Sequence, residues 1–559
     1  MRSLPTASDP LPVDPPQNAV SQDSAAREAA RDAEAASGTA TLARSAGLVS
    51  IAVMTSRVLG LVRDQVMLIY FGAADQMDAF NVAFRLPNLV RDLFAEGAMS
   101  AAFVPTFTRE LQNRGKAAAW ELGNLVISCL ILVTGVIVIA GIVFADPLTR
   151  WIASEYARKP GKIELTIELT RIMFPFLTFI AIAVACMGML NALRRFFIPA
   201  LAPAMFNVAA IASVFLIVPF MSWFGWDPMV GLAIGTLIGG VGQVLLQWPQ
   251  LHREGYRFRF QLAPSDPRLR EILLLMAPST IGLAAVQVNQ LVNMWLATHE
   301  GTGAVSYLNM AFRLMYLPIG LFGVSIATAA LPTIARHAAN EDKTGIRESV
   351  SQALRLMLML NVPATFGLVA LALPILQLLV EYGKMVPEAT AGVAFSVICY
   401  APGLVGYSAV KIASPTFYAL KDSRTPVTIS FVAIAANIGF NLALVGPLGY
   451  GGLALGTGIA SLVNAGLLLW YLSKRLGGID GRRIAVSFVK ILIASIVMAG
   501  IAWGSERTLA LTWPGMSIVQ RVVRVVVPMG LALGVLALMA KLLRLAEFER
   551  ALARVLRRR

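Results

Sequence analysis

Apolar segments long enough to cross a membrane follow one another along most of this chain. From residue 46 onward, stretches of mostly hydrophobic residues alternate with short polar connections. Because one span needs roughly 20 apolar residues, the pattern predicts 14 transmembrane helices. They are expected at 46–71, 77–107, 118–145, 168–192, 199–223, 227–249, 270–297, 304–335, 349–379, 388–418, 425–445, 451–473, 485–504 and 520–541.

The composition agrees with a membrane protein and excludes an ordinary soluble domain. Hydrophobic residues make up 57% of the chain and charged residues only 14%, whereas soluble domains carry about 25% charged residues. Residues 1–45 differ, since they are rich in Ala, Pro, Asp and Ser and contain no apolar run. We interpret them as a disordered cytoplasmic extension and not as a signal peptide.

The net charge of +15 could suggest a nucleic-acid partner, but its distribution indicates a membrane topology instead. With the N-terminus inside, the inner loops and tail hold 26 Lys and Arg residues and the outer loops hold eight. Cytoplasmic loops of membrane proteins are enriched in Lys and Arg. The chain is therefore predicted to be a multi-pass membrane protein, with both termini cytoplasmic and no nucleic-acid partner.

An internal repeat divides the chain. Ala83-Phe84-Arg85-Leu86 recurs at 311–314, Pro105 recurs as Pro332, and Pro199 recurs as Pro426, always at an offset of 227 to 228 residues. This offset spans six predicted helices, so the two copies should have the same orientation, as in parallel-repeat transporters. The predicted fold is all-α and polytopic, with two six-helix lobes and two further helices. The predicted divisions are 1–45 (extension), 46–249 (N-lobe), 250–473 (C-lobe) and 474–559 (last two helices and a basic cytoplasmic tail).

Charged side chains inside the first two predicted helices are the main functional signal. In the first helix the polar face comprises Ser56, Arg57, Gly60, Arg63 and Asp64. In the second helix the polar stripe comprises Asp78, Asn81, Arg85, Asn88, Asp92 and Glu96, with Arg91 beside it. Each ionisable group at membrane depth costs on the order of 2.5–3.5 kcal/mol. Such a stripe forms either an ion-pair network that only holds helices together or a wall of a transport cavity, and the excess of arginine favours the cavity.

The repeat sharpens this hypothesis. In the second copy Asn309 matches Asn81, but Arg313 is the only charged residue left in the stripe, so it has no evident carboxylate partner there. An unpaired arginine suggests that the cargo is the partner, because guanidinium groups bind phosphate oxygens through two parallel hydrogen bonds. The predicted diphosphate-binding residues are Arg57, Arg63, Arg91 and Arg313. The candidate hinges are Gly60, Pro87, Gly97 and Pro105.

The N-terminal motifs resemble the MurJ (MviN) lipid II flippase family. They are Ser56-Arg57-Val58-Leu59-Gly60, Arg63-Asp64, Phe71-Gly72, Asp78-Ala79-Phe80, Leu86-Pro87-Asn88-Leu89, Phe94-Ala95-Glu96-Gly97-Ala98 and Ala102-Phe103-Val104-Pro105. The resemblance covers about 45–545 and implies the multidrug/oligosaccharidyl-lipid/polysaccharide exporter fold, in which family arginines match the four named above and Asp64 matches an acidic neighbour. It further implies that lipid II (undecaprenyl-diphosphate-MurNAc-pentapeptide-GlcNAc) moves from the cytoplasmic to the periplasmic leaflet by alternating access. Membrane lipids and the cell-wall synthesis machinery are the other implied partners.

Some features depart from the family. Asp92 stands where some relatives have a basic residue, and Phe312 where some have an acid, so the ion-pair partners are open. Some relatives resemble sodium-coupled carriers, whereas the corresponding region here offers only the uncharged side chains of Asn289, Asn293, Asn437, Asn441 and Thr457. These residues form either a sodium site or interhelical hydrogen bonds. No cofactor and no resident metal are predicted, and coupling to the membrane potential or to a monovalent cation is left open.

Several alternatives to a lipid II flippase are open, including a regulatory scaffold, which would leave the intramembrane arginines unexplained. An exporter of another lipid-linked polysaccharide unit shares the same cargo chemistry. A carrier of cationic drugs would need a cavity dominated by carboxylates, which the arginine excess disfavours. A membrane enzyme acting on lipid-linked sugars would need an acid/base or metal cluster, and only Asp78, Asp92 and Glu96 are candidates, with no histidine nearby. The sequence therefore predicts a transporter and not an enzyme.

Overall fold

The computed structural model describes residues 48–92, 98–545 and 547–548, and in these ranges every regular element is a helix. The first helix covers residues 48–71. The remaining elements of the first half are α2 (Asp75–Arg91), α3 (Ala98–Val143), α4 (Ala145–Ile152), η2 (Ser154–Arg158), α5 (Lys162–Met173), α6 (Phe176–Ala192), α7 (Phe197–Leu216), α8 (Val218–Met221), η3 (Ser222–Phe224) and α9 (Pro228–Arg253).

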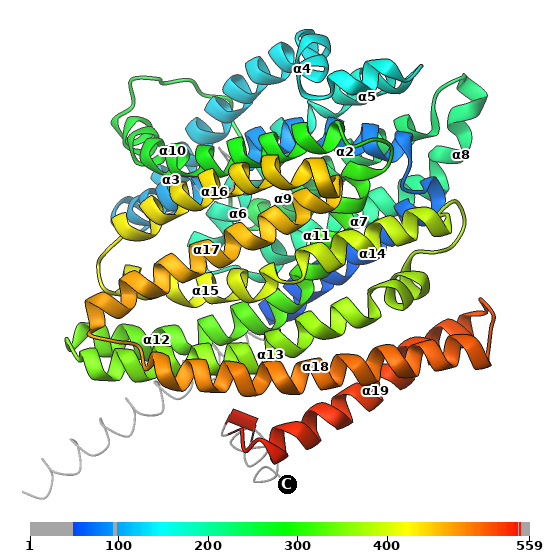
Figure 1. Cartoon of the computed structure of the whole chain (residues 1–559). Coiled ribbons are helices and arrows are strands. Elements are labelled where there is room, and N and C mark those ends of the chain that lie inside the picture. The colour runs from blue at the N-terminus through cyan, green and yellow to red at the C-terminus, as the bar shows by residue number, and fades with distance from the viewer. Residues whose placement is uncertain (1–47, 93–97, 546, 549–559) are drawn as a thin grey trace, which may run out of the picture.

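The second half continues with further helices and is followed by a helical hairpin (Figure 1). Its elements are α10 (Pro267–Thr298), α11 (Ala304–Pro318), η4 (Ile319–Val324), α12 (Ser325–Ala339), α13 (Lys343–Leu379), α14 (Pro387–Tyr400), α15 (Gly403–Ala419), α16 (Arg424–Leu448) and α17 (Tyr450–Leu476). The hairpin consists of α18 (Gly481–Thr512) and α19 (Ile518–Leu542). Residues 93–97 lie outside the described part, and they include the predicted polar-stripe residue Glu96 and the hinge candidate Gly97.

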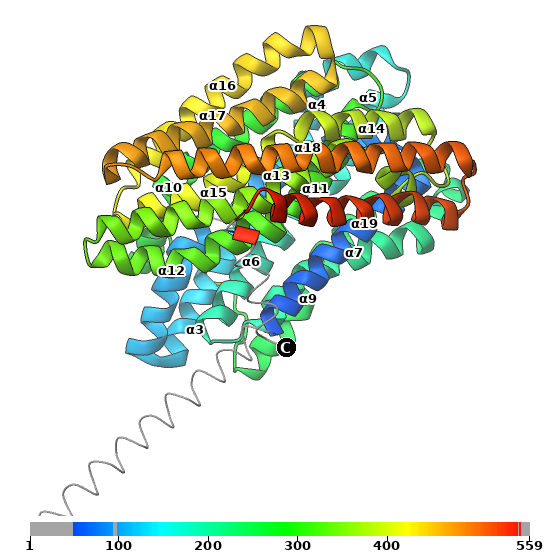
Figure 2. The same cartoon turned by 60° about the horizontal axis from the view of Figure 1, so that its bottom comes forward.

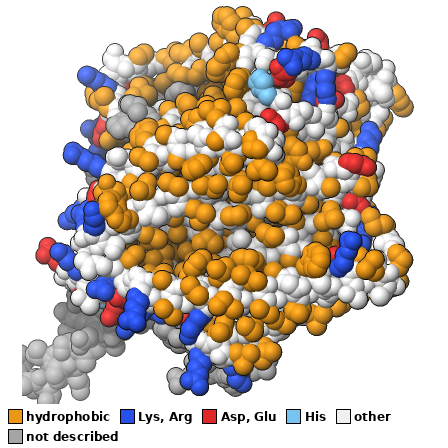
Figure 3. Space-filling model, viewed as in Figure 1, with side chains coloured by type: hydrophobic (Ala, Val, Ile, Leu, Met, Phe, Trp, Pro, Cys, Tyr) orange, Lys and Arg blue, Asp and Glu red, His pale blue; other side chains and the backbone are white. Residues whose placement is uncertain are grey.

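The described helices are those of a multi-pass membrane protein. Ten of them are long and apolar enough to cross a bilayer, or eleven if the bent pair α14–α15 is taken as one span. Figure 3 shows why this surface suits lipid: a broad hydrophobic band crosses the molecule, and charged side chains gather toward its edges. The all-helical prediction is confirmed, whereas the count of 14 spans stays a prediction.

The structure adds detail where the hydrophobic pattern was too coarse. The predicted third and fourth helices are separated by two short elements, α4 and η2, which sequence analysis did not predict because an eight-residue amphipathic helix has no span-length apolar run. The predicted helix at 388–418 is bent by 48° between α14 and α15. The predicted helix at 304–335 contains the π-helical turn η4. Gly115, with a positive φ of 79°, breaks α3 between the predicted second and third helices.

The internal repeat is visible in the backbone. Arg194 and Lys421 lie 227 residues apart, and both adopt φ = 59°, a left-handed conformation that is uncommon for residues other than glycine. Each ends a helix with the same hydrogen bonds: the Arg195 amide donates to the Leu190 carbonyl, and the Asp422 amide donates to the Phe417 carbonyl, both at 2.9 Å. This matches the Schellman type of helix ending. The lobe boundaries at 249 and 473 stay predictions.

The hairpin α18–α19 packs on α13 of the second half (Figures 1 and 2). Ion pairs hold it near both ends of α13. Toward one end Arg355 of α13 pairs with Glu547 at 2.6 Å, and beyond the other end Arg521 of α19 pairs with the Glu381 carboxylate at 3.6 Å and donates to the backbone carbonyls of Gln377 and Glu381. Because the hairpin is tied at both ends, it should follow the second half when the halves move.

Small residues let α15 and α17 approach closely. A Cβ on Gly403 would lie 2.6 Å from the Gly458 Cα, and a Cβ on Gly406 would lie 2.6 Å from the Ser461 carbonyl carbon. The Ser461 hydroxyl also donates to the Gly403 carbonyl at 3.0 Å. In lipid, where no hydrophobic force drives helices together, such close backbone contacts and interhelical hydrogen bonds are the main source of packing energy.

Replacing Gly406 should therefore destabilise the second half. We expect Gly406→Val to force α15 away from α17 and to cost about 1–3 kcal/mol, the usual effect of overpacking. The measurement is the apparent melting temperature of detergent-purified protein. Gly439→Val on α16 is the control, because a Cβ there meets nothing within 4 Å. Equal melting temperatures for both variants and the wild type would contradict the packing argument.

Candidate functional site

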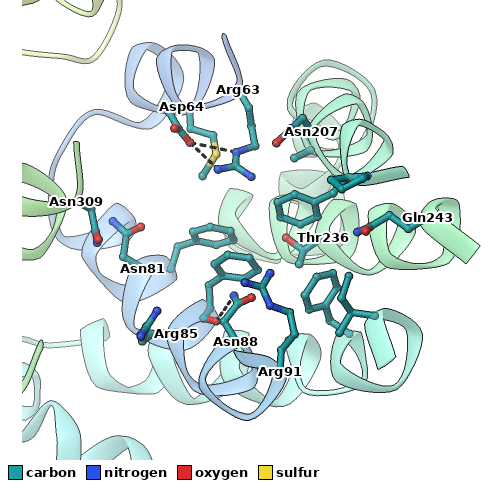
Figure 4. A pocket seen from close by; sticks show the side chains of 18 of the residues that line it. Arg63, Asp64, Asn81, Arg85, Asn88, Arg91, Asn207, Thr236, Gln243 and Asn309 are labelled. Atoms are coloured by element: carbon teal, nitrogen blue, oxygen red, sulfur yellow. Dashed lines mark hydrogen bonds and ion pairs between the residues drawn. The ribbon is translucent and has the colours of Figure 1, made fainter. Parts of the chain in front are cut away.

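A cavity of about 630 Å³ lies between the two halves. Its walls come from the first helix, α2, α6, α7 and α9 on one side and from α10 and α11 on the other. Figure 4 shows its polar side chains converging from these helices. The charged residues that line it are four arginines and one carboxylate: Arg63, Arg85, Arg91, Arg313 and Asp64. The cavity wall is therefore strongly cationic.

One carboxylate joins two arginines from opposite halves. The Arg63 Nε and Nη2 groups donate to Asp64 Oδ1 at 3.1 and 2.8 Å, and Arg313 of α11 forms an ion pair with Asp64 Oδ2. The prediction that Arg313 lacks a carboxylate partner was therefore wrong. The helix that carries Arg313 offers no carboxylate partner, but the first half supplies Asp64. A pairing between residues so far apart in the chain cannot be read from the pattern of one helix. The Arg313 side chain still has 44% of its surface exposed, and it lines the cavity.

A second polar cluster links α2 to α10. Asp92 accepts hydrogen bonds from Arg91 at 2.7 and 3.1 Å, and its other oxygen lies 3.9 Å from Arg85. Gln287 of α10 completes the cluster: its carbonyl accepts from Arg85 at 2.9 Å and its amide donates to Asp92 at 3.3 Å. The acidic residue that departs from the family pattern thus serves as the partner of two arginines on its own helix.

The remaining predicted residues divide into two groups. Cavity-lining ones are Arg63, Asp64, Asn81, Arg85, Asn88, Arg91, Asn309 and Arg313. The others, which lie outside the lining, are Ser56, Arg57, Asp78 and Asp92. The Ser56 carbonyl accepts a hydrogen bond from the Asn207 side chain at 3.0 Å. Of the hinge candidates, Pro87 lies inside α2, Pro105 inside α3, and Gly60 faces Asn207. Whether any of them bends stays a prediction.

Arg57 lies apart from the other three predicted diphosphate ligands. Its side chain is exposed, and a Cβ on Gly320 would come within 2.8 Å of its Nη1. The Arg57 guanidinium therefore lies against the π-helical turn η4 of the other half. The cavity brings Arg63, Arg91 and Arg313 together and adds Arg85, while Arg57 stands at a separate contact between the halves.

Asp78 forms a further contact between the two halves. It is fully buried and accepts hydrogen bonds from the Gly303 and Ser306 amides at 2.7 and 3.1 Å and from the Ser306 hydroxyl at 2.7 Å. These amides are at the start of α11, so a carboxylate of one half satisfies the N-terminal donors of a helix in the other half. Lys162, itself buried, lies 3.1 Å from the same carboxylate. Nearby, the Lys384 amide donates to the Ile69 carbonyl at 2.8 Å.

Several lining residues were missed by the sequence analysis. On the first-half side they are Asn207 of α7 and Thr236, Gln243 and Gln247 of α9, together with the aromatic residues Phe80, Phe84, Phe176 and Phe206. A signal for the α9 residues was present, because polar residues spaced seven and four apart lie on one face of a helix. That face was overlooked because it carries no charge.

The amide cluster in the second half forms interhelical hydrogen bonds. Asn441 donates to Asn293 at 2.7 Å, and Asn437 donates to Thr457 at 3.1 Å. No group of three or more His, Cys, Asp or Glu side chains suited to a metal occurs among the described residues. The buried Asn289 Oδ1 and Asn441 Oδ1 atoms accept no hydrogen bond, and binding of a monovalent cation here stays a prediction.

Comparisons with known proteins agree on one family. A family model described as lipid II flippase MurJ matches residues 67–524. A probable lipid II flippase MurJ of Vibrio cholerae is 35% identical over 494 residues, covering 86% of this chain and 92% of that relative. The lipid II flippase MurJ of Burkholderia cenocepacia is 33% identical over 452 residues, covering 80% and 87%.

Solved structures give the same result for the fold. A lipid II flippase MurJ in an inward closed conformation superposes with a TM-score of 0.72 at 25% identity, covering 88% of this chain and 99% of that one. An inward-facing multidrug resistance MATE transporter of the MOP superfamily gives a TM-score of 0.64 at 17% identity and supports the fold alone. This chain belongs to the lipid II flippase MurJ family, and it is a transporter and not an enzyme.

Proposed function

We propose that this protein moves lipid II from the cytoplasmic to the periplasmic leaflet of the bacterial inner membrane by alternating access. The observation that carries the proposal is the shared carboxylate: Asp64 pairs with Arg63 of its own half and with Arg313 of the other. Two guanidinium groups that converge on one anion from opposite halves are suited to hold a diphosphate between them.

The charge of the cavity fits this cargo. Four lining arginines face one lining carboxylate, so the wall has an excess of positive charge even when Asp92 is counted as a partner of Arg91 and Arg85. A desolvated positive charge is costly without an anion, and a diphosphate supplies more than one negative charge. A cationic drug would be repelled by the same wall.

Alternating access follows from where the halves touch. The proposal assigns closure of one side of the cavity to the contact of Asp78 with the first turn of α11, and the hydrogen bonds between them support this role. Cargo can leave toward that side only after the Asp78 hydrogen bonds break. A diphosphate that replaces Asp64 as the partner of Arg63 and Arg313 would neutralise the cavity and let the halves rock about the cargo.

The orientation proposed here places both termini in the cytoplasm. The excess of Lys and Arg in alternate loops supports it, and it puts the Asp78 contact on the periplasmic side. An inside-negative potential would then assist export, because moving one negative charge outward across 100 mV gains ~2.3 kcal/mol. Coupling to a monovalent cation is the alternative, and the cell-wall synthesis machinery is the proposed destination of the cargo.

Removing Arg313 should abolish function. In cells depleted of their own lipid II flippase, we expect wild type to restore growth and Arg313→Ala to fail, because a lost charge-assisted hydrogen-bond pair costs about 1.5–3 kcal/mol, or roughly 10–100-fold in cargo affinity. Arg482→Ala, an exposed arginine at the start of α18, is the control and should restore growth.

Expression of every variant is compared by immunoblot. Rescue by Arg313→Ala would remove this arginine from the site while leaving the function. If well-expressed wild type failed to rescue, transport of another lipid-linked polysaccharide unit, which shares the diphosphate, would become the favoured function.

Weakening the Asp78 contact should open the side that it closes. We expect Asp78→Asn to lose the charge that holds Lys162 and the start of α11, and so to raise the accessibility of the cavity several-fold. The measurement is labelling of a cysteine at Asn309, in a variant without Cys129, Cys186 and Cys399, by a maleimide that cannot cross the membrane and is added from the periplasmic side.

The matched control is Asp146→Asn, since Asp146 is exposed and pairs only locally with Arg150. Its labelling should equal that of the parent. Unchanged labelling in Asp78→Asn would show that this contact does not govern access.

A further inference from the structure

The connection between α13 and α14 reaches from the second half to the first. It covers residues 380–386, which we call the latch loop. The Lys384 amide of this loop donates to the Ile69 carbonyl, in the last turn of the first helix, at 2.8 Å. The Lys384 side chain extends over the same turn, with its ammonium nitrogen 5.9 Å from the centre of the Tyr70 ring. The latch loop therefore holds the end of the first helix through its backbone and through a side chain.

Two glycines make this contact possible. Gly72 and Gly383 both adopt a positive φ, at 74° and 59°, a conformation that favours glycine. A Cβ on Gly72 would lie 2.7 Å from the Lys384 carbonyl oxygen, and a Cβ on Gly383 would overlap the Ile69 carbonyl oxygen. The two backbones can touch only because neither position carries a side chain. The contact therefore depends on the exact shape of the latch loop.

The latch loop lies on the side of the molecule where Asp78 joins the halves. The Gly303 amide donates to Asp78 at 2.7 Å, and a Cβ on Gly303 would lie 2.7 Å from the Ala73 carbonyl oxygen. Ala73 directly follows the segment that the latch loop holds. The second half thus contacts the connection between the first helix and α2 at two places. Separating the halves on this side requires both contacts to part.

The latch loop is itself held by the hairpin. Arg521 of α19 is only 8% exposed, and its guanidinium donates to the Glu381 carbonyl at 2.6 Å and to the Gln377 carbonyl. It also lies 3.6 Å from the Glu381 carboxylate and 4.6 Å from the centre of the Tyr382 ring. Figure 1 shows the turn between α18 and α19 at the same end of the molecule as the turn between α13 and α14. One buried cation thus contacts both residues that precede Gly383.

The shape of the latch loop depends on this arginine. Glu381 is 6% exposed, and Arg521 is its cationic partner. The Glu381 Oε2 atom and the Tyr382 hydroxyl are buried without a hydrogen-bond partner in the described part of the chain. A buried carboxylate that loses its counter-charge is strongly destabilised. Without Arg521, Glu381 would therefore turn toward water and move the latch loop away from the first helix.

We propose that Arg521 is a positioning residue of the transport cycle, through which the hairpin α18–α19 keeps the Asp78 side of the cavity closed. The hairpin packs on α13 and contributes no residue to the cavity lining, so it can act on closure only indirectly. Arg521 shapes the latch loop, and the latch loop holds the end of the first helix. The inference rests on the proposed alternating access but not on which lipid-linked cargo is carried.

The test measures the gap between the halves on this side by double electron–electron resonance. Spin labels are attached at Arg158 of the first half and Glu388 of the second, both exposed. The full-length protein, with its three cysteines replaced by serine, is placed in lipid nanodiscs. We expect Arg521→Gln to raise the ratio of open to closed molecules roughly tenfold, the effect of a lost charged hydrogen bond.

Arg524→Gln is the matched control for the loss of an arginine from the hairpin. Arg524 lies one turn further along α19 and is also largely shielded, but it pairs with Glu506 of α18, inside the hairpin. Its distance distribution should match that of the wild type, and melting temperatures show whether each variant folds. If Arg524→Gln opened the gap as much as Arg521→Gln, general loosening of the hairpin would explain both results and overturn the inference.

Gly383→Ala tests the latch loop without changing the hairpin. Its added Cβ would meet the Ile69 carbonyl oxygen, so the gap should widen as in Arg521→Gln. Gly225→Ala is its control, because Gly225 also has a positive φ, at 70°, but a Cβ there meets nothing within 4 Å. A gap that stays closed in folded Gly383→Ala would contradict the proposed hold on the first helix.

The outcomes separate this inference from the proposed function. If Asp78→Asn opens the gap while Arg521→Gln and Gly383→Ala leave it closed, the latch is wrong and alternating access stands. If none of the three opens it, the latch and the proposed role of Asp78 both fail. Failure of the wild type to restore growth in depleted cells would count against lipid II as the cargo, and the distances would still decide the latch.

Discussion

The interaction on which the rest of the structure depends is the pairing of charges inside the membrane-spanning region. Asp64 stands between Arg63 of its own helix and Arg313 of the opposite half. A charge at membrane depth must meet a counter-charge or a polar cavity, and here one carboxylate serves two guanidinium groups. The excess of positive charge keeps the cavity suited to an anion, and the shared carboxylate draws the two halves together around it.

The same constraint explains where the halves close. Asp78 is buried because the amides at the start of α11 and the Lys162 ammonium satisfy it. A capping side chain usually belongs to the helix that it caps, whereas Asp78 of α2 caps α11 and so joins the two halves. Hydrogen bonds between two folded halves can break and reform without unfolding either half, which is what alternating access requires.

The lining of the cavity combines charged and uncharged groups. Arginines from the first helix, α2 and α11 surround the position of an anion, while α6, α7 and α9 supply rings and uncharged amides. The diphosphate is common to every cargo on the same lipid carrier, so the arginines alone cannot select among cargoes. Selection has to come from groups that contact what differs.

The sequence by itself determined the helical segments, the parallel repeat, the family and most of the arginines, because hydrophobic runs, charge periodicity and recurring motifs are local properties of the chain. Only the tertiary structure decided which charges pair. Arg313 seemed unpaired because Asp64 lies 249 positions before it in the chain, and Arg57 was grouped with arginines whose cavity it does not line. The uncharged lining residues were also overlooked, because only the fold shows that the polar face of α9 and the rings of α2, α6 and α7 line one cavity.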